Sequence, residues 1–128
     1  MAKKILLIED DPFLSSLLGN RLKREGFDLV SVKSGAEAIK ELKAPSAGSG
    51  QAPDLILLDI ILPGKSGFEV LEDMKSDPQL PKVPVVIISN LGQDADIEKG
   101  KELGAAEYIV KAKVSIDDLV AKIKGYLK

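Results

Sequence analysis

The sequence predicts an α/β protein in which helices cover both faces of an open, doubly wound sheet of five parallel strands. Three observations support this. Short apolar runs bounded by polar or turn residues recur along the chain, segments with helical spacing of apolar residues lie between them, and several of the runs are apolar at nearly every position. Alternating strands and helices favour a parallel sheet, and strands that are apolar throughout are typical of burial from both sides.

The five predicted strands and five predicted helices follow one another in strict alternation. The strands are predicted at residues 5–8, 29–32, 55–58, 83–88 and 108–110. The helices are predicted at residues 13–22, 36–42, 68–74, 97–103 and 116–127. Each helix therefore follows a strand, as three stacked layers require.

Local signals predict where some helices begin and end. Asp11 followed by Pro12 is typical of an N-cap and a first helical position, and Ser115 with Asp118 resembles a capping box in which Asp replaces Glu. The glycines suited to helix C-termini are Gly26 and Gly104.

The chain is predicted to form one domain over residues 1–128. Its length and its 45% hydrophobic content suit a single core, and it contains neither an internal repeat nor a linker to a second unit. Residues 44–53 are rich in small residues and are predicted to form a surface loop between the second helix and the third strand.

Composition excludes several kinds of function. The chain has 18 basic and 20 acidic residues and a pI near 5.2, so we expect no direct nucleic-acid binding and no attraction to anionic membranes. It has no cysteine and no histidine, which excludes disulfides, the usual zinc ligands and a Ser/His/Asp triad. No apolar run is long enough for a signal or membrane segment, so we expect a soluble, cytoplasmic protein.

Polar residues follow the predicted strands, at the edge where an open parallel sheet binds ligands. The first strand ends in Glu9 and Asp10, the third in Asp59, the fourth in Ser89 and the fifth in Lys111. Carboxylates gathered at one edge repel each other, and oxygen ligands favour a hard cation, so Mg²⁺ or Mn²⁺ is expected. A lysine and a hydroxyl beside the metal suit a bound phosphoryl group. The pattern predicts phosphoryl-transfer chemistry.

A structural role also accounts for several of these residues. Asp11 is explained by helix capping, the acidic pair before it by a solvated strand end, Ser89 by a turn and Lys111 by exposure. Asp59 is different, because apolar residues both precede and follow it. A carboxylate in that position needs a partner.

Taken together, the residues resemble the receiver domains of two-component response regulators, the family that includes the chemotaxis regulator. The motif residues are the pair Glu9-Asp10, Asp59 within LDIILPGKSG, Ser89 and Lys111, and the resemblance covers essentially the whole chain. It implies a flavodoxin-like sheet of strand order 2-1-3-4-5 and a stand-alone phosphoacceptor domain that signals rather than acts as an enzyme. Receivers assist their own phosphorylation and dephosphorylation.

The resemblance also implies roles for single residues. Asp59 would accept the phosphoryl group and bind Mg²⁺ together with Asp10, while Glu9 acts through water and the backbone carbonyl of Ile61 completes the protein's ligands. A histidine kinase or a histidine phosphotransfer protein would be the donor.

After transfer, Ser89 and Lys111 would contact the phosphoryl oxygens and Tyr108 would change rotamer. These changes would remodel the surface of the fourth helix, fifth strand and fifth helix, to which a downstream protein would bind. The domain would act as a monomer or as a phosphorylation-dependent dimer.

The chain departs from the usual receiver pattern at three places. Lys111 is followed by Ala112 where the family usually has proline, often after a cis bond, so the sequence leaves the isomer of this peptide open. Ser89 replaces the commoner threonine and keeps its hydroxyl. Ser66 stands where aspartate is common and is interpreted as a surface change.

Two apolar residues lie near the expected phosphoryl site. Ile61 follows Asp59 by two positions and Leu91 follows Ser89 by two. Neither side chain can orient water for attack on phosphorus, so we expect a long-lived phosphoryl state.

Two other functions are compatible with parts of the pattern. A phosphatase of the haloacid-dehalogenase type also has an aspartate nucleophile and Mg²⁺, but its second aspartate would fall at Ile61. A receiver-like interaction module that is not phosphorylated is the other alternative, and the Lys111-Ala112 sequence favours it. No P-loop or dinucleotide fingerprint follows the first strand.

Overall fold

The computed structural model describes residues 2–44 and 51–127 and confirms the predicted fold. The strands are β1 (Lys4–Ile8), β2 (Asp28–Val32), β3 (Leu55–Leu58), β4 (Val85–Ser89) and β5 (Glu107–Val110). The helices are α1 (Pro12–Arg24), α2 (Gly35–Lys43), α3 (Gly67–Ser76), α4 (Asp94–Glu102) and α5 (Ile116–Tyr126). All strand pairs are parallel, in the order β2-β1-β3-β4-β5. This is the flavodoxin-like order expected from the resemblance.

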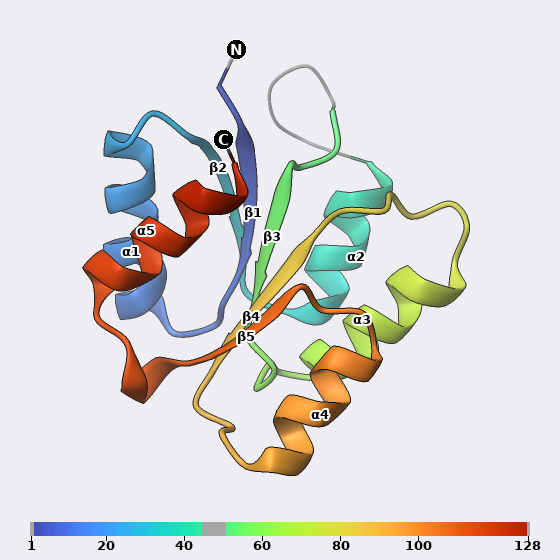
Figure 1. Cartoon of the computed structure of the whole chain (residues 1–128). Helices are drawn as coiled ribbons and strands as arrows, with labels where there is room; N and C mark the ends of the chain where they lie inside the picture. The colour runs from blue at the N-terminus through green and yellow to red at the C-terminus, as the bar shows by residue number, and fades with distance from the viewer. Residues whose placement is uncertain (1, 45–50, 128) are drawn as a thin grey trace.

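The sheet separates two apolar cores because successive residues of a strand point to opposite faces. Helices α1 and α5 lie on one side of it and α2, α3 and α4 on the other (Figure 1). In β3, Ile56 and Leu58 belong to the core beneath α2 and α3, whereas Leu55 and Leu57 pack with residues of α1 and α5. All four are fully buried, as the continuous apolar run predicts.

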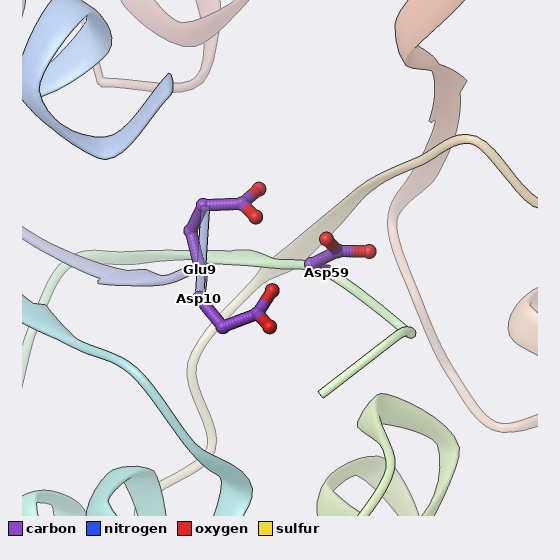
Figure 2. A group of neighbouring side chains, drawn as sticks. All are labelled: Glu9, Asp10 and Asp59. Atoms are coloured by element: carbon purple, nitrogen blue, oxygen red, sulfur yellow. The ribbon is translucent and has the colours of Figure 1, made fainter. Parts of the chain in front are cut away.

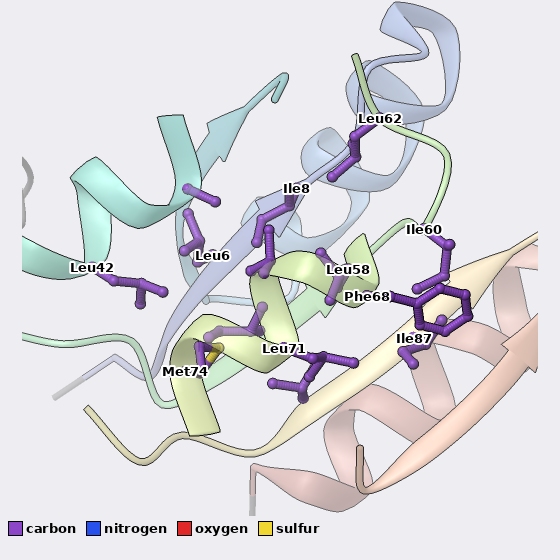
Figure 3. Close-up of a cluster of buried hydrophobic side chains, with 14 of the residues drawn as sticks. Leu6, Ile8, Leu42, Leu58, Ile60, Leu62, Phe68, Leu71, Met74 and Ile87 are labelled. Carbon is purple, nitrogen blue, oxygen red and sulfur yellow. The ribbon is translucent and has the colours of Figure 1, made fainter. Parts of the chain in front are cut away.

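The core beneath α2 and α3 extends past the carboxyl end of β3 (Figure 3). Phe68 and Leu71 of α3 pack there with Ile60 and Leu62, which follow the strand. Burying one such side chain contributes about 2 kcal/mol. The segment after Asp59 is therefore held by apolar contacts rather than left as an open loop.

Both predicted N-caps are confirmed. Asp11 accepts a hydrogen bond from a backbone N–H in the first turn of α1 at 2.9 Å, and Ser115 accepts one from the N–H of Asp118 at 3.0 Å. Gly26 and Gly104 follow the ends of α1 and α4 with φ of 95° and 98°, a region that favours glycine.

Ser66 has a more specific role than the surface change expected from the sequence. It is the N-cap of α3, where its hydroxyl accepts from the N–H of Glu69 at 3.3 Å and its own N–H donates to the Glu69 carboxylate at 3.2 Å. Serine and aspartate both cap helices well, so the replacement preserves the start of α3.

Most observed element boundaries differ from the sequence prediction by one to three residues, and two of these differences are informative. β4 begins at Val85 rather than at residue 83, because Pro84 has no N–H to donate to a sheet. α4 begins at Asp94, ahead of its first apolar residue. Most of the predicted loop, residues 45–50, lies outside the described residues. Across the part of the chain that the structure describes, we find no helix with the length and apolar character needed to cross a membrane.

Candidate functional site

Three carboxylates meet at the carboxyl edge of the sheet. β1 and β3 are neighbours, with Ile8 opposite Leu58, so the residues that follow them come together. Glu9 and Asp10 leave β1 and Asp59 leaves β3, and their side chains lie side by side (Figure 2). One oxygen from each of the three lies within 4.8 Å of the others. The sequence prediction that these residues form one cluster is confirmed.

Lys111 lies between two of the carboxylates. Its Nζ is 2.8 Å from Glu9 Oε1 and 2.8 Å from Asp59 Oδ2. The side chain of Glu9 is 3% exposed and that of Asp59 is 5% exposed, so both ion pairs are largely shielded from water. Lys111 opens a short 3₁₀ turn, Lys111–Lys113, and its bond to Ala112 is trans. The ammonium reaches the acidic cluster without the usual proline.

The cluster changes the ionisation of its members. Burial raises the pKa of Glu9 to about 7, against the lowering effect of its hydrogen bond to Lys111, and the nearby charge of Asp59 raises it further. Burial alone would lower the pKa of Lys111, but its hydrogen bonds to Asp59 and Glu9 outweigh this and raise it. The single positive charge of Lys111 therefore does not fully neutralise the negative charge of the three carboxylates.

The donor set fits a hard divalent cation. Each of the three carboxylates offers an oxygen to a common position, and no nitrogen or sulfur ligand stands beside them. Asp10 is exposed, whereas Glu9 and Asp59 are buried, so the cluster opens to solvent on one side. Mg²⁺ and Mn²⁺ prefer oxygen ligands and keep several waters, which suits this half-open geometry.

Ser89 and Tyr108 are linked through the backbone of Leu91. Ser89 is fully buried, and its Oγ accepts from the N–H of Leu91 at 3.3 Å. The hydroxyl of Tyr108 donates to the carbonyl of Leu91. Ser89 at the end of β4 and Tyr108 of β5, the predicted hydroxyl donor and switch residue, thus both contact the same short loop after β4.

Ile61 lies beside the acidic cluster, as predicted. Its N–H donates to Asp59 Oδ1 at 3.1 Å, and its side chain is 54% exposed. This bond fixes one Asp59 oxygen while Lys111 holds the other. The direct metal contact of the Ile61 carbonyl stays a prediction.

Gly67 is a site residue that sequence reasoning missed. A Cβ at this position would collide with the backbone carbonyl of Asp59 and with Cα of Ile60. Its N–H also donates to the carbonyl of Ile60 at 2.9 Å. Only glycine lets the start of α3 approach the Asp59 backbone this closely, and its place after the Ser66 cap is the sequence signal that could have found it.

A flavodoxin-like sheet with an acidic cluster, a lysine and a hydroxyl at its carboxyl edge is the arrangement of a signalling receiver. The family model described as "Response regulator receiver domain" matches residues 5–124. The chain therefore belongs to the response regulator receiver domain family of two-component systems.

The relatives include transcriptional regulators. The chain is 33% identical over 128 residues to the phosphate regulon transcriptional regulatory protein PhoB of Rhizobium meliloti (strain 1021), and 34% identical to PhoB of Escherichia coli (strain K12). Each alignment covers 100% of this chain and 53% of the relative. The chain spans about half the length of these proteins.

Solved structures resemble the whole chain. The phosphorylated cyanobacterial phytochrome response regulator RcpA has 36% identity and a TM-score of 0.81, covering 98% of this chain and 91% of that one. The Mn²⁺-bound form of response regulator Rcp1 has 33% identity and a TM-score of 0.78, covering 96% and 90%.

Proposed function

We propose that this chain is a single receiver domain that accepts a phosphoryl group on Asp59. The observation that carries the proposal is the position of the Asp59 carboxylate at the carboxyl edge of the sheet, held by Lys111 and by the N–H of Ile61, beside Glu9 and Asp10. Relatives support it, since one of the similar structures is a phosphorylated response regulator.

The phosphodonor in this proposal is a phosphohistidine on a histidine kinase or a histidine phosphotransfer protein. A carboxylate oxygen of Asp59 attacks phosphorus as the phosphorus–nitrogen bond of the donor breaks, which yields an aspartyl phosphate and a free imidazole. Lys111 stabilises the charge on the transferring oxygens from its position 2.8 Å from Asp59.

Asp10 and Asp59 would hold Mg²⁺, or Mn²⁺, with Glu9 acting through water and the Ile61 carbonyl completing the set. When bound, the cation neutralises charge on the phosphoryl oxygens. The oxygen-only cluster supports this assignment, as does the Mn²⁺-bound form of a similar response regulator.

Signal output in this proposal is a change of binding surface rather than an enzymatic product. Ser89 turns toward the phosphoryl oxygens, its loop moves inward, and Tyr108 follows through its bond to Leu91. A downstream protein then binds the face of α4, β5 and α5, with the receiver as a monomer or a phosphorylation-dependent dimer. The proposal keeps the cytoplasmic location expected from the sequence and assigns no nucleic-acid contact to these residues.

The test is incubation with Mg²⁺ and a small phosphodonor such as acetyl phosphate, followed by intact mass measurement. We expect one added phosphoryl group, lost in Asp59→Asn and kept in the control Asp28→Asn, an exposed aspartate at the start of β2. No addition to the wild-type chain under these conditions would refute the proposal and favour the phosphorylation-independent interaction module.

A phosphatase is the weaker alternative. It needs an acid and base two residues after the nucleophile, where this chain has the apolar Ile61. Turnover of a phosphomonoester by wild-type protein, abolished in Asp59→Asn, would favour that alternative over the receiver.

A further inference from the structure

Helix α4 rests on the sheet through a glycine. Its residues are mostly polar, and Gly100 is its buried residue. A Cβ built at Gly100 would lie 2.7 Å from Cδ1 of Ile87 and 2.9 and 3.3 Å from Cδ2 and Cε2 of Tyr108. Carbon atoms in contact prefer about 3.5–4.0 Å, so a side chain here forces a neighbour to move.

The ring that faces Gly100 belongs to Tyr108, the residue that is connected to Ser89 of the proposed phosphorylation site through Leu91. Tyr108 is partly buried, and its hydroxyl donates to the carbonyl of Leu91, whose N–H donates to Ser89. Moving the ring from beneath α4 would break the bond to Leu91. The space left by Gly100 is therefore coupled to the loop after β4 that contains Leu91 and contacts Ser89.

We propose that Gly100 is a positioning residue for Tyr108: because it has no Cβ, the ring can lie under α4 and hold the loop after β4. The coupling of this position to phosphorylation rests on the function proposed for Asp59, but the positioning itself does not. Gly100→Ala would displace the ring, break its hydrogen bond to Leu91 and favour the conformation in which the Tyr108 side chain is turned out from beneath α4.

Helix propensity alone predicts that replacing a helical glycine with alanine is favourable rather than disruptive. Alanine stabilises a helix relative to glycine, so a helical glycine without neighbours should be improved by it. Gly125 in α5 is such a position, since a Cβ there meets nothing within 4 Å. Gly125→Ala is therefore a matched control that changes propensity without crowding a tyrosine.

Other contacts of α4 explain why the helix can stay in place while the ring moves. Lys99 lies over the ring of Phe68 at 4.7 Å from its centroid, and the ammonium of Lys75 donates to the carbonyl of Glu102 at 3.5 Å. Both contacts join α4 to α3 and do not involve Tyr108. These contacts favour relief of the crowding by rotation of the ring rather than by displacement of α4.

The first measurement uses unphosphorylated protein labelled with 3-fluorotyrosine. The chain has two tyrosines, so Tyr126→Phe assigns the two ¹⁹F resonances. In Gly100→Ala we expect the Tyr108 resonance to move to its position in the urea-unfolded chain while that of Tyr126 stays. In Gly125→Ala we expect the Tyr108 resonance to stay. An unmoved Tyr108 resonance in folded Gly100→Ala overturns the proposal, whatever is found for phosphorylation.

The second measurement separates the two neighbours of Gly100. Ile87→Val removes the Cδ1 atom, so Gly100→Ala/Ile87→Val keeps only the collision with the tyrosine ring. We expect the displaced resonance to persist in this double variant. Its return to the wild-type position would assign the effect to Ile87 and overturn the proposal. If Gly100→Ala alone does not fold, we expect the double variant Gly100→Ala/Tyr108→Ala to fold and Gly100→Ala/Ile87→Val not to fold. Folding of the second double variant but not of the first would also overturn the proposal.

The third measurement is the rate of phosphorylation by acetyl phosphate with Mg²⁺. The rate should scale with the fraction of molecules in the conformation that reacts, and couplings of this kind typically change such a conformational equilibrium by about fivefold or more. We therefore expect phosphorylation of Gly100→Ala to be slower by about that factor. In a Tyr108→Ala background the same substitution should have no further effect. Equal rates in Gly100→Ala and wild type would show that the position of the ring is not coupled to phosphorylation. That result would overturn the proposed coupling of Gly100 to the site.

Discussion

Removing the Lys111 ammonium should strongly destabilise the protein when no divalent cation is present. Lys111→Met keeps a long side chain but leaves Glu9 and Asp59, both at most 5% exposed, without their shared cation. A buried charge that loses its partner cannot be compensated by water. The substitution therefore tests whether the ion pairs hold the carboxyl edge of the sheet.

The expected size follows from the two pairs. At an effective dielectric constant of about 20 and about 4 Å between charge centres, each pair attracts with roughly 4 kcal/mol. The mutation also removes the desolvation cost of the ammonium, which offsets part of this, and breaking buried pairs typically costs about 3–5 kcal/mol. For a chain of this size that lowers the midpoint of thermal unfolding by roughly 10–20 °C.

The assay is urea unfolding in the presence of a chelator, followed by circular dichroism, for wild type, Lys111→Met and Lys111→Met/Asp59→Asn. The double variant should recover much of the loss because it removes one uncompensated charge. Mg²⁺ should reduce the deficit of the single variant, because a bound cation replaces the missing positive charge. A single variant within about 1 kcal/mol of wild type, well below the loss expected for a broken buried pair, would refute the argument.

Three further predictions concern the phosphoryl lifetime, the Tyr126–Glu107 hydrogen bond at the opposite edge of the sheet, and the backbone beside Asp59. Ile61→Asn and Leu91→Glu should each shorten the lifetime of the phosphorylated protein, measured by intact mass over time, because polar side chains can orient an attacking water. The hydrogen bond to Glu107, aided by burial, raises the pKa of Tyr126 to about 12. Glu107→Gln should therefore lower this pKa in an ultraviolet titration, and the stabilisation from the bond should be present below about pH 10 and lost as pH rises through the folded value. Gly67→Ala should destabilise the fold by about 2 kcal/mol or more in urea unfolding, because its Cβ meets backbone.

Each of these predictions has an outcome that contradicts it. Unchanged lifetimes in both polar variants would mean that water reaches phosphorus by another route. An unaltered Tyr126 titration in Glu107→Gln would exclude the hydrogen bond as the cause. For Gly67→Ala the control is Gly125→Ala, whose added methyl meets open space, and equal stability of the two variants would contradict the crowding argument.

The sequence was sufficient for the fold because the apolar pattern and the topology agree. Leu55–Leu58 is apolar at every position, and it is the central strand, covered on both faces. Boundaries were less predictable where the first residues of an element are polar. α4 begins at Asp94, before any apolar residue, and its N-cap Gln93 makes no side-chain cap hydrogen bond that would mark it.

The composition of the site was predictable, but its geometry was not. The rule that ligands bind at the carboxyl ends of parallel strands brought Glu9, Asp59 and Lys111 to one place. It could not show that one ammonium bridges both carboxylates, since that depends on the backbone after β5. Gly67 and Gly100 were missed for a related reason: a glycine required by a close approach is recognised only when the approaching atoms are known.

The bond between Lys111 and Asp59 joins residues 52 positions apart, and the carboxylate of Glu9 comes from a third strand end. None of these groups is near the others until β1, β3 and β5 occupy their places in one sheet. Contacts between such distant residues require the loops between them to close, which carries an entropic cost. In the unfolded chain Asp59 is therefore a solvated carboxylate without its lysine partner, and the site exists only once the sheet has formed.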